Sequence, residues 1–292
     1  MQDWRDYVHT MATRYKGRIH YWEMWNEPNL RDFYTGDVDK LVDLSREAYS
    51  ILHEVDSTNV LSSPPPTGGV NGAQWLDDYF RRGGSKYLDV VGFHFYVTPG
   101  DPEKMVPIAQ RLTEVMAKYK VLEKPLWGTE AGWFIANHKT YVKPGTGSFS
   151  RVLDDDESPA FVARTYILLW VTGVSRFYWY GWDNHLMGLT EEDGTPKASA
   201  MAFAETQKWL VGARMIGCDA DSSDTWICEI ERDGEYRGYI LWNTQGTRNV
   251  PIPASWNARN QHDLSGRTRA LAGVHSIQVG VKPILLENKT PQ

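Results

Sequence analysis

The sequence contains little of what marks several large classes of protein. It has only two cysteines, Cys218 and Cys228, in 292 residues, which is too few for a disulfide framework. The two could pair across a hairpin or remain reduced, buried thiols, and we favour the reduced thiols. No His/Cys cluster has the spacing of a metal site, and there is neither a His-Glu-x-x-His helix nor a phosphate-binding loop. The sequence therefore predicts no metal and no cofactor.

Positive charge and long apolar runs are also scarce. The net charge is −6 at pH 7 and no basic stripe is present, which argues against nucleic acid and anionic membranes as partners. No run of about 20 apolar residues could span a bilayer. The first residues, Met-Gln-Asp-Trp-Arg, lack the basic and apolar regions of a signal peptide. We therefore expect a cytoplasmic protein if this N-terminus is native.

Aromatic residues, by contrast, are abundant. The chain has 13 Trp and 15 Tyr, within an ordinary soluble composition of 41% hydrophobic and 23% charged residues. Core packing explains most of the tryptophans. A few are candidates for stacking on sugars, because the C–H face of a pyranose ring packs well against indole.

Strands and helices alternate over about the first 210 residues. Hydrophobic periodicity predicts helices over residues 3–16, 38–55, 74–82, 102–119, 159–171 and 196–210. It predicts strands over residues 18–25, 60–62, 88–95, 125–129 and 176–180, and a long loop over 132–157. Asp37 and Ser158 are the expected N-caps of two helices. This alternation predicts a parallel sheet with right-handed crossovers.

The pattern changes from about residue 213 onward. Residues 226–231 and 236–242 alternate around Asp233-Gly234, which is a strong hairpin signal. Further short β segments follow. We therefore predict an α/β domain over residues 1–211 and a small antiparallel, β-sandwich-like domain over residues 212–292.

Two predicted strands end in a glutamate that is flanked by tryptophan. Residues 21–29 (Tyr-Trp-Glu-Met-Trp-Asn-Glu-Pro-Asn) place Glu27 just past one strand, and residues 125–132 (Pro-Leu-Trp-Gly-Thr-Glu-Ala-Gly) place Glu130 at the end of another. A carboxylate in such a place is costly to desolvate unless it has a partner or a chemical role. Hydrolysis of a glycosidic bond needs two carboxyl groups. The alternatives are a helix-capping carboxylate for Glu27 and a salt-bridged strand end for Glu130.

These segments resemble the retaining glycoside hydrolases of clan A, and they are most similar to the family 39 group. Residues 25–29 look like the acid/base motif on the fourth barrel strand, and Glu130 looks like the nucleophile on the seventh. Residues 92–96 (Gly-Phe-His-Phe-Tyr) look like the sixth strand, whose His and Tyr line the sugar site in such enzymes. The resemblance covers about residues 1–210. It implies a retaining β-glycosidase that acts on a β-linked oligosaccharide or glycoside, such as a xyloside, glucoside or galactoside.

The resemblance gives each site residue a role. Glu27 would be the acid/base and Glu130 the nucleophile, with burial and the charge of Glu130 favouring the protonated form of Glu27. Tyr96 is a candidate donor to the nucleophile. Asn26 would donate to a sugar hydroxyl. His94 is a sugar ligand or a satisfied core histidine, and we favour the ligand.

Other residues have two interpretations each. Trp179 and Trp182 are sugar platforms or core residues, and we include both in the candidate site. Glu23 has the strand parity of Glu27 and would point into a barrel, where a structural ion pair is favoured over a third catalytic carboxyl. The acidic run 154–157 precedes a helix, where anions suit the helix dipole, so we favour that role over calcium binding.

The chain departs from the resembled fold in one respect. If Glu27 ends the fourth strand, the first three of eight barrel strands have no counterpart, which predicts an incomplete (β/α) TIM-type barrel of about five βα units. An open edge exposes unpaired backbone and apolar side chains. Either the chain is a fragment or another subunit covers the edge, and we predict a homodimer or higher homo-oligomer. The competing function is a non-catalytic carbohydrate-binding remnant that keeps the motifs.

Overall fold

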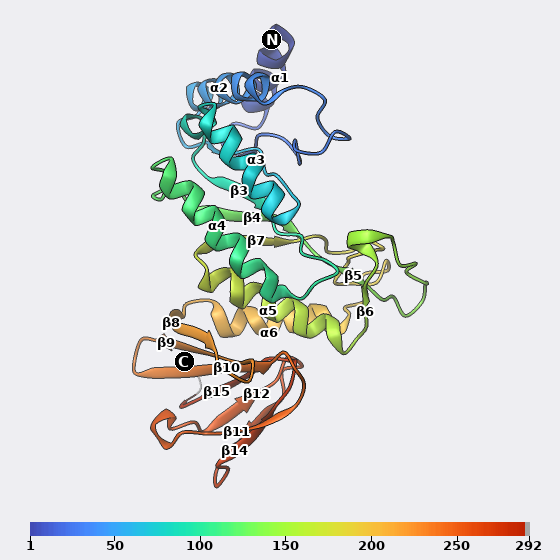
Figure 1. The fold of residues 1–292 in the computed structure, drawn as a ribbon, viewed down its shortest axis with the longest axis vertical. Helices are drawn as coiled ribbons and strands as arrows, with labels where there is room; N and C mark the ends of the chain where they lie inside the picture. The colour runs from blue at the N-terminus through green and yellow to red at the C-terminus, as the bar shows by residue number, and fades with distance from the viewer. Residues whose placement is uncertain (290–292) are drawn as a thin grey trace. The chain divides into compact units, whose positions relative to one another are not determined.

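The structure is a computed structural model, and it describes residues 1–289 (Figure 1). The helices are α1 (Gln2–Arg14), α2 (Val38–Val55), α3 (Gly69–Arg81), α4 (Met105–Lys118), α5 (Glu157–Val171) and α6 (Ala198–Leu210), with short 3-10 turns at Gly84–Lys86, Pro102–Lys104, Gly147–Phe149 and Ala254–Trp256. The strands of the first part are β1 (Tyr21–Glu23), β2 (Val60–Ser62), β3 (Val91–His94), β4 (Leu126–Ala131), β5 (Phe134–Ile135), β6 (Val152–Leu153) and β7 (Val174–Trp179). The later strands are β8 (Arg214–Ala220), β9 (Thr225–Arg232), β10 (Tyr236–Asn243), β11 (Arg248–Pro251), β12 (Asn260–His262), β13 (Thr268–Ala270), β14 (Ser276–Val279) and β15 (Ile284–Glu287). Within residues 1–289, no helix combines the length and apolar character that crossing a membrane requires.

The chain divides into two compact units. The first consists of residues 1–97, 104–132 and 172–179, and the second contains the remainder of the described chain. Strand β8 begins shortly after α6 ends, where the sequence predicts a change of domain. Because α5 and α6 belong to the second unit together with the later strands, the boundary after residue 211 stays a prediction.

Parallel strands form the centre of the first unit. β1 pairs with β2, and β3, β4 and β7 form a second group in the order β3-β4-β7. A bridge between Ser62 and Val90 connects the two groups. Helix α3 packs closely on β3, since a Cβ at Gly72 would lie 3.0 Å from the ring of Phe93. These strands and helices form the predicted α/β arrangement of TIM type, while the incompleteness of the barrel stays a prediction.

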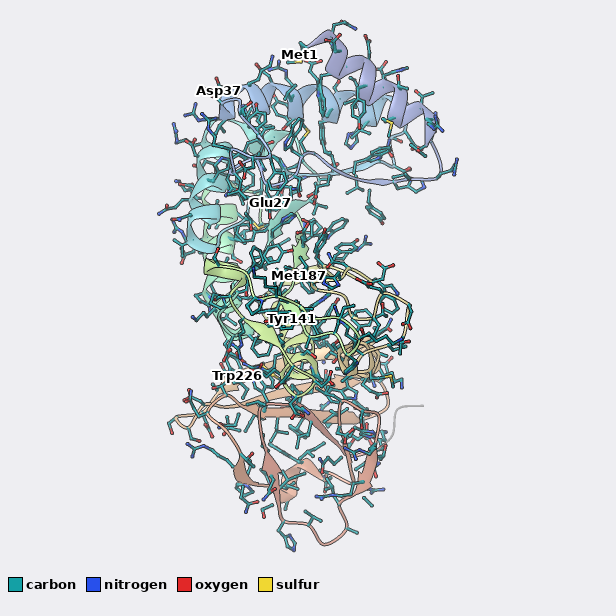
Figure 2. The ribbon with its side chains drawn as sticks, turned by 90° about the vertical axis from the view of Figure 1, so that its right-hand side faces the viewer. Met1, Glu27, Asp37, Tyr141, Met187 and Trp226 are labelled. Carbon is teal, nitrogen blue, oxygen red and sulfur yellow. A yellow bond between two sulfur atoms is a disulfide. The ribbon has the colours of Figure 1, made fainter. Side chains whose placement is uncertain are left out.

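Helix α2 has the bounds and the N-cap that the sequence predicts. The Asp37 carboxylate accepts a hydrogen bond from the backbone N–H of Lys40 at 2.7 Å, and Asp37 is labelled at the start of this helix in Figure 2. Leu41, Ala48 and Leu52 are buried on one side of the helix. Helical spacing of apolar residues, together with a capping aspartate, was enough to define this element.

The predicted N-cap of α5 is wrong. The helix begins at Glu157, so Ser158 lies within its first turn. The Asp154 carboxylate accepts hydrogen bonds from the N–H groups of Asp156 and Glu157, at 2.9 and 2.8 Å. A charged acceptor just before the helix satisfies amides that have no partner in the first turn. The acidic run therefore lies at a helix start, as we expected.

Two further segments differ from the predictions. Helix α3 begins at Gly69, well before residue 74, because Gly68 and Gly69 adopt left-handed conformations with φ of 88° and 59° at its start. The pair of glycines suggested a longer loop. The predicted loop over residues 132–157 contains the short parallel strands β5 and β6.

The C-terminal part of the chain is an antiparallel β structure. One sheet has the order β13-β12-β15-β10-β9-β8, and β11 pairs with β14. The predicted hairpin is present, with Tyr236 opposite Arg232 and Trp242 opposite Trp226. Side chains from both sheets share one apolar core: Tyr239, Leu241, Leu271, Ile277, Val279, Ile284 and Leu286.

The two cysteines are paired, so the favoured prediction of reduced thiols is wrong. Cys218 in β8 lies directly opposite Cys228 in β9, and a disulfide joins them. Opposed residues on neighbouring antiparallel strands have their Cβ atoms close together. The β8–β9 register, which the sequence did not define, decided the pairing.

Candidate active site

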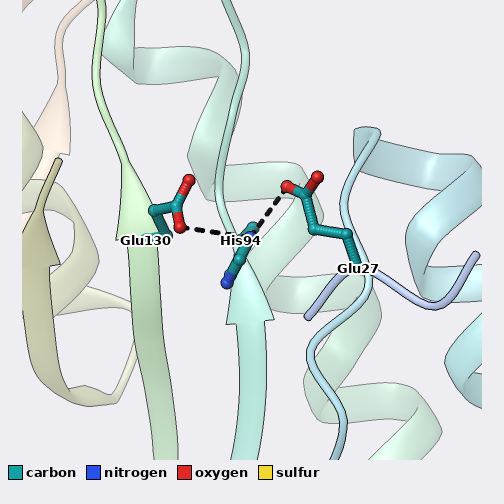
Figure 3. A group of neighbouring side chains, drawn as sticks. All are labelled: Glu27, His94 and Glu130. Carbon is teal, nitrogen blue, oxygen red and sulfur yellow. Dashed lines mark hydrogen bonds and ion pairs between the residues drawn. The ribbon is translucent and has the colours of Figure 1, made fainter. Parts of the chain in front are cut away.

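Four predicted site residues meet where three strands of the first unit end. Glu27 follows β1, His94 is the last residue of β3, Tyr96 lies two residues further, and Glu130 lies near the end of β4. His94 Nδ1 is 2.8 Å from Glu27 Oε1 and 4.0 Å from Glu130 Oε2 (Figure 3). The Tyr96 hydroxyl donates a hydrogen bond to Glu130 Oε1 at 2.6 Å. The carboxyl ends of parallel strands have thus gathered these residues, as position alone suggested.

Glu27 is held in an unusual backbone conformation. Its φ of 41° lies in the left-handed region, which costs a non-glycine residue of order 1–3 kcal/mol unless its surroundings enforce it. The Glu27 amide donates to the Pro65 carbonyl at 3.1 Å. Two residues later, the Asn29 side chain bonds both the N–H and the C=O of Thr67, at 3.0 and 2.9 Å. The loop after β2 therefore fixes the loop that carries Glu27, and Glu27 itself is 8% exposed.

Glu130 occupies an irregular position in its strand. Phe93 of β3 pairs with Gly128, but the next residue, His94, pairs with Glu130, so the ladder skips Thr129. The β4–β7 ladder shifts over the same stretch. Bulges of this kind redirect side chains and are common beside active sites. Here the shift places His94 and Glu130 opposite each other.

His94 is almost completely enclosed, with 1% of its surface exposed. Its backbone N–H donates to the Pro66 carbonyl at 3.0 Å. Nδ1 faces both carboxylates, whereas Nε2 is buried and has no hydrogen-bond partner within the described part of the chain. The residue is therefore as buried as a core histidine, but its polar atoms are not satisfied as a core histidine's would be.

One oxygen or nitrogen from each of Glu27, His94 and Glu130 lies within 4.8 Å of the other two. This spacing is compatible with a bound metal ion. The hydrogen bonds of Glu27 to His94 and of Glu130 to Tyr96 account for the same arrangement without an ion. Two neighbouring carboxyl groups, each with its own hydrogen-bond partner, form a site suited to proton transfer.

Glu23 has no cationic partner within the described part of the chain. No Lys, Arg or His forms a salt bridge with it among residues 1–289, and the predicted ion pair stays a prediction. The residue as a whole is exposed, but its carboxyl group lies among protein atoms. This burial is the main cause that raises the pKa of Glu23; the hydroxyl of Thr129 and the ring of His94 oppose it.

Residues 2–199 match the protein family described as glycosyl hydrolase catalytic core. The chain belongs to this family. The match covers more than half of the sequence and includes all of the residues predicted for the site. A search of curated protein sequences finds no match.

Solved structures of glycosyl hydrolases have the same fold. A family 39 glycoside hydrolase from Bacteroides cellulosilyticus WH2 is similar with a TM-score of 0.78 and 22% identity, over 99% of this chain and 63% of that one. A glucosidase from Croceicoccus marinus has a TM-score of 0.65 and 15% identity, over 98% of this chain and 74% of its own. A monomeric β-xylosidase from Caulobacter crescentus CB15 has a TM-score of 0.64 at 15% identity, with the same coverage of 98% and 74%. The chain thus spans 63% of the length of the Bacteroides protein.

These similarities confirm the resemblance to clan A and family 39 that residues 25–29, 92–96 and 130 suggested. They also confirm a TIM-like α/β domain with a β-rich C-terminal part. At this level of identity, the solved structures show the fold of this chain and not its substrate.

The remaining predicted residues lie in different places. Asn26 is exposed and directly precedes Glu27. Trp179 ends β7 and pairs with Ala131, one residue past Glu130. Trp182 belongs to the second unit and is 59% exposed. Their roles toward a sugar stay predictions.

The sequence did not predict that Pro65 and Pro66 hold the backbone of the site residues. Their carbonyls accept the hydrogen bonds from the amides of Glu27 and His94. Proline has no N–H to donate, but its C=O is free to accept. The run of prolines after β2 marks a loop in the sequence, but it does not show which amides their carbonyls will meet after folding.

Proposed function

We propose that this chain hydrolyses β-linked O-glycosidic bonds by double displacement with retention of configuration. Glu130 is the nucleophile and Glu27 the acid/base. The observation that carries the proposal is the proximity of the two carboxyl groups. One oxygen of Glu27 and one oxygen of Glu130 lie within 4.8 Å of each other and of a ring nitrogen of His94. Retaining enzymes place their carboxyl groups about 5–5.5 Å apart, whereas inverting enzymes leave about 6.5–9.5 Å for a water molecule.

In the first step, Glu27 gives its proton to the leaving-group oxygen while the Glu130 carboxylate attacks the anomeric carbon. The glycosidic C–O bond breaks, and a glycosyl ester of Glu130 forms. In the second step, ionised Glu27 takes a proton from water, which attacks the anomeric carbon and releases Glu130. The Tyr96 hydroxyl, 2.6 Å from Glu130 Oε1, supports the ionised form of the nucleophile, because hydrogen bonds to a charged acceptor favour the charge.

The substrate proposed is a β-linked oligosaccharide or glycoside, such as a xyloside, glucoside or galactoside. The solved structures similar to this chain include a β-xylosidase and a glucosidase. Exposed Asn26 can donate to a sugar hydroxyl next to the bond that is cut, and Trp179 and Trp182 offer ring faces for stacking. The reaction as written needs no metal and no cofactor. We retain the division into a catalytic domain, residues 1–211, and a β domain, residues 212–292, as part of this proposal.

Release of nitrophenol from a panel of aryl β-glycosides tests the proposal. We expect turnover of at least one member, and proton NMR of the first sugar product should show the β anomer before mutarotation. The competing function, a carbohydrate-binding remnant without turnover, predicts binding of the same glycosides and no release. An initial α anomer would indicate inversion and overturn the double displacement.

We also propose that the chain self-associates as a homodimer or higher homo-oligomer. Among the described residues, β1 pairs only with β2 and β7 only with β4. Tyr21 on β1 and Tyr178 on β7 are 52% and 48% exposed. A symmetric dimer would cover such a face with its own copy, since an isologous interface is self-complementary.

Charge on these strands supports the same arrangement. Glu23 has no cationic partner, and Arg176 has no carboxylate partner, within residues 1–289; the Arg176 guanidinium lies 4.5 Å from the ring centres of both Tyr21 and Trp127. In a symmetric dimer, the two charges can pair across the interface. Light scattering at micromolar concentration should report a dimer or larger species, and Arg176→Glu should weaken it while Glu23→Arg combined with Arg176→Glu restores it. A monomeric wild-type chain would refute the proposal.

A further inference from the structure

Two long segments of the second unit meet at one histidine. The first segment, residues 136–156, runs from the end of β5 to the start of α5, and the second, residues 180–197, runs from the end of β7 to the start of α6 (Figure 1). His138 Nε2 is 2.6 Å from Asp155 Oδ2, and Nδ1 is 2.9 Å from Glu191 Oε1. The backbone N–H of His138 donates to the same Glu191 oxygen at 3.1 Å. One ring therefore bridges a carboxylate of its own segment and a carboxylate of the other.

We propose that His138, in its imidazolium form between Asp155 and Glu191, is a pH-dependent clasp that holds the two segments together and fixes the loop that carries Trp182. The clasp is closed while the ring is protonated and opens as the ring loses its proton. Its effect on turnover rests on the proposed function, because Trp182 is a sugar platform there. The clasp itself does not, because it consists of contacts within the second unit.

The partners of the ring define its protonation state. Both nitrogens face carboxylate oxygens, which accept hydrogen bonds and donate none when ionised. A neutral imidazole has one N–H, so it can satisfy one carboxylate only and presents a lone pair to the other. The imidazolium donates to both. The hydrogen bond to Asp155 is the main cause that raises the pKa of His138, followed by the charge of Asp155, and Glu191 raises it further.

The charges around the clasp balance when the ring is protonated. Asp155 and Glu191 contribute two negative charges. The ring of His138 and the ammonium of Lys197 contribute two positive ones. Lys197 is 1% exposed and donates from Nζ to the Asn137 side chain at 2.5 Å; burial lowers its pKa, and the charges of Glu191 and Asp155 oppose this. Further charged groups of the two segments have partners of their own: Glu192 with His185, Asp193 with Lys139, Asp156 with Lys282, Arg151 with Asp101 and Glu157, and Asp154 with amides at the start of α5.

The clasp lies one residue from the hydrogen bonds that hold Trp182. The Trp182 carbonyl accepts from the N–H and the hydroxyl of Thr190, at 2.9 and 3.1 Å, and Glu191 directly follows Thr190. On the first segment, the Asn137 amide donates to the His185 carbonyl at 2.8 Å. Glu191 is 3% exposed, whereas Trp182 is 59% exposed. Opening the clasp therefore removes a buried support from a segment whose tryptophan faces solvent.

The direction of the pH effect follows from the raised pKa. The contribution of protonated His138 is complete below the ordinary histidine pKa of about 6.5. It is lost as the pH rises through the higher pKa of the folded protein, because the folded chain then has to give up a proton that its carboxylates hold. The clasp is therefore closed in mildly acidic solution and open in alkaline solution.

Hydrogen–deuterium exchange of the full chain tests the clasp without a substrate. After correction for the intrinsic pH dependence of exchange, amides of residues 180–192 should exchange about 3- to 10-fold faster at a pH of about 9 than at a pH of about 6. In His138→Gln, which does not titrate, this difference should disappear. His185→Gln is the matched control. Its pair with Glu192 at 2.7 Å lies within one segment, so the difference should remain. Equal pH dependence in the wild type and His138→Gln would overturn the clasp.

The ring itself can be observed by NMR. In nitrogen-15 histidine-labelled protein, the His138 ring, assigned by comparison with His138→Gln, should carry protons on both nitrogens at a pH of about 6 and titrate above about 6.5. Glu191→Gln and Asp155→Asn should each lower its pKa. Asp155 is half exposed, so its variant remains informative if the buried Glu191→Gln does not fold. A His138 ring that titrates at or below about 6.5 would refute the proposal.

Kinetics then connect the clasp with Trp182. In the wild type, KM for aryl β-glycosides should rise by about 3- to 10-fold between the same two pH values, and His138→Gln should have the higher KM at both. Titration of Glu27 and Glu130 affects kcat in both proteins alike, so the difference in KM isolates the clasp. A pH-dependent KM that is unchanged in His138→Gln would overturn the link to Trp182. A wild type that turns over no glycoside, but shows the pH-dependent exchange, would contradict the proposed function and leave the clasp intact.

Discussion

The molecule contains two clusters built from glutamate, histidine and tyrosine, one in each compact unit. The site cluster consists of Glu27, His94, Tyr96 and Glu130. The second, which we call the β cluster, contains Tyr236, His262, Thr268 and Glu287. In the β cluster, Glu287 is 1% exposed. Its carboxylate accepts hydrogen bonds from the Tyr236 hydroxyl at 3.0 Å and from His262 Nε2 at 2.8 Å. The Thr268 hydroxyl is hydrogen-bonded to His262 Nδ1 at 3.0 Å.

The two clusters differ in how completely their polar atoms are satisfied. Both nitrogens of His262 have a partner, and the single carboxylate of Glu287 accepts hydrogen bonds from both Tyr236 and His262. In the site cluster, one nitrogen of His94 faces two carboxylates and the other has no partner within the described chain. A fully satisfied buried network stabilises a fold, whereas unsatisfied buried groups call for an explanation such as catalysis. Residue types alone would not separate the two.

Backbone geometry separates the clusters in the same direction. Glu287 lies in a regular ladder, opposite Gly238 on one side and Asn260 on the other. Glu27 has a positive φ, and Glu130 lies where the β3–β4 register shifts. Backbone strain and β-bulges are common at functional sites, where the position of a side chain matters more than regular strand pairing.

The sharpest test of this comparison replaces one glutamate from each cluster. Glu130→Gln should lower turnover by at least about a thousandfold, because the amide cannot form the glycosyl ester. A 2-fluoro glycoside should label Glu130 covalently, as read by peptide mass spectrometry. Glu287→Gln is the matched control and should retain turnover per folded molecule. Labelling of any other carboxylate would contradict the assignment.

Removal of the proposed acid/base should have a selective effect. Glu27→Ala should slow substrates with poor leaving groups by about 10²- to 10⁴-fold. Activated aryl glycosides should be affected far less in their first step, since their leaving groups need no protonation. Azide should restore part of the rate and give a β-glycosyl azide, detectable by chromatography. Equal losses on both kinds of substrate, without azide rescue, would point to a structural role like that of Glu287.

The β cluster should instead govern stability. Glu287→Gln keeps the shape of the side chain but replaces one acceptor oxygen with an NH₂ group, which then faces a donor. We expect a loss of about 1–3 kcal/mol in the free energy of unfolding, measured by urea denaturation, with kcat and KM unchanged. A change in the pH–rate profile of this variant would show that the two clusters are not functionally separate.

The sequence predicted those parts of the molecule that depend on local pattern. The α2 helix with its Asp37 cap follows from spacing and capping chemistry, and Glu27 and Glu130 follow from apolar strands that end in an acid. The support from Pro65 and Pro66 was not predictable in this way. It depends on which loops lie side by side after folding, and no local pattern reports that.

Register was the other quantity that the sequence left undefined. The shift that pairs His94 with Glu130, and the alignment that opposes Cys218 to Cys228, are each set by one residue of offset between strands. A one-residue slip reverses the face of every following side chain. Glu23 illustrates a related point, since strand parity predicts the direction of its side chain but does not identify the partner of its carboxylate.

The smallest expected effect concerns the tyrosine of the β cluster and pH. Burial, followed by the negative charge of Glu287, raises the pKa of Tyr236 above its ordinary value. The fold therefore favours the neutral phenol, and this contribution to stability is complete below the unfolded pKa of about 10. As the pH rises further, the unfolded chain loses the Tyr236 proton while the folded chain keeps it, so stability falls by about 1.4 kcal/mol per pH unit.

Tyr236→Phe should be less stable than the wild type by about 0.5–1.5 kcal/mol at neutral pH, through loss of its hydrogen bond to Glu287. The difference should shrink above pH of about 10, as urea denaturation at several pH values can show. The other tyrosines titrate in both proteins, so they do not affect the comparison. A constant difference would mean that Tyr236 is not buried beside a charge. The β cluster would then resemble the site cluster more closely than its hydrogen bonds indicate.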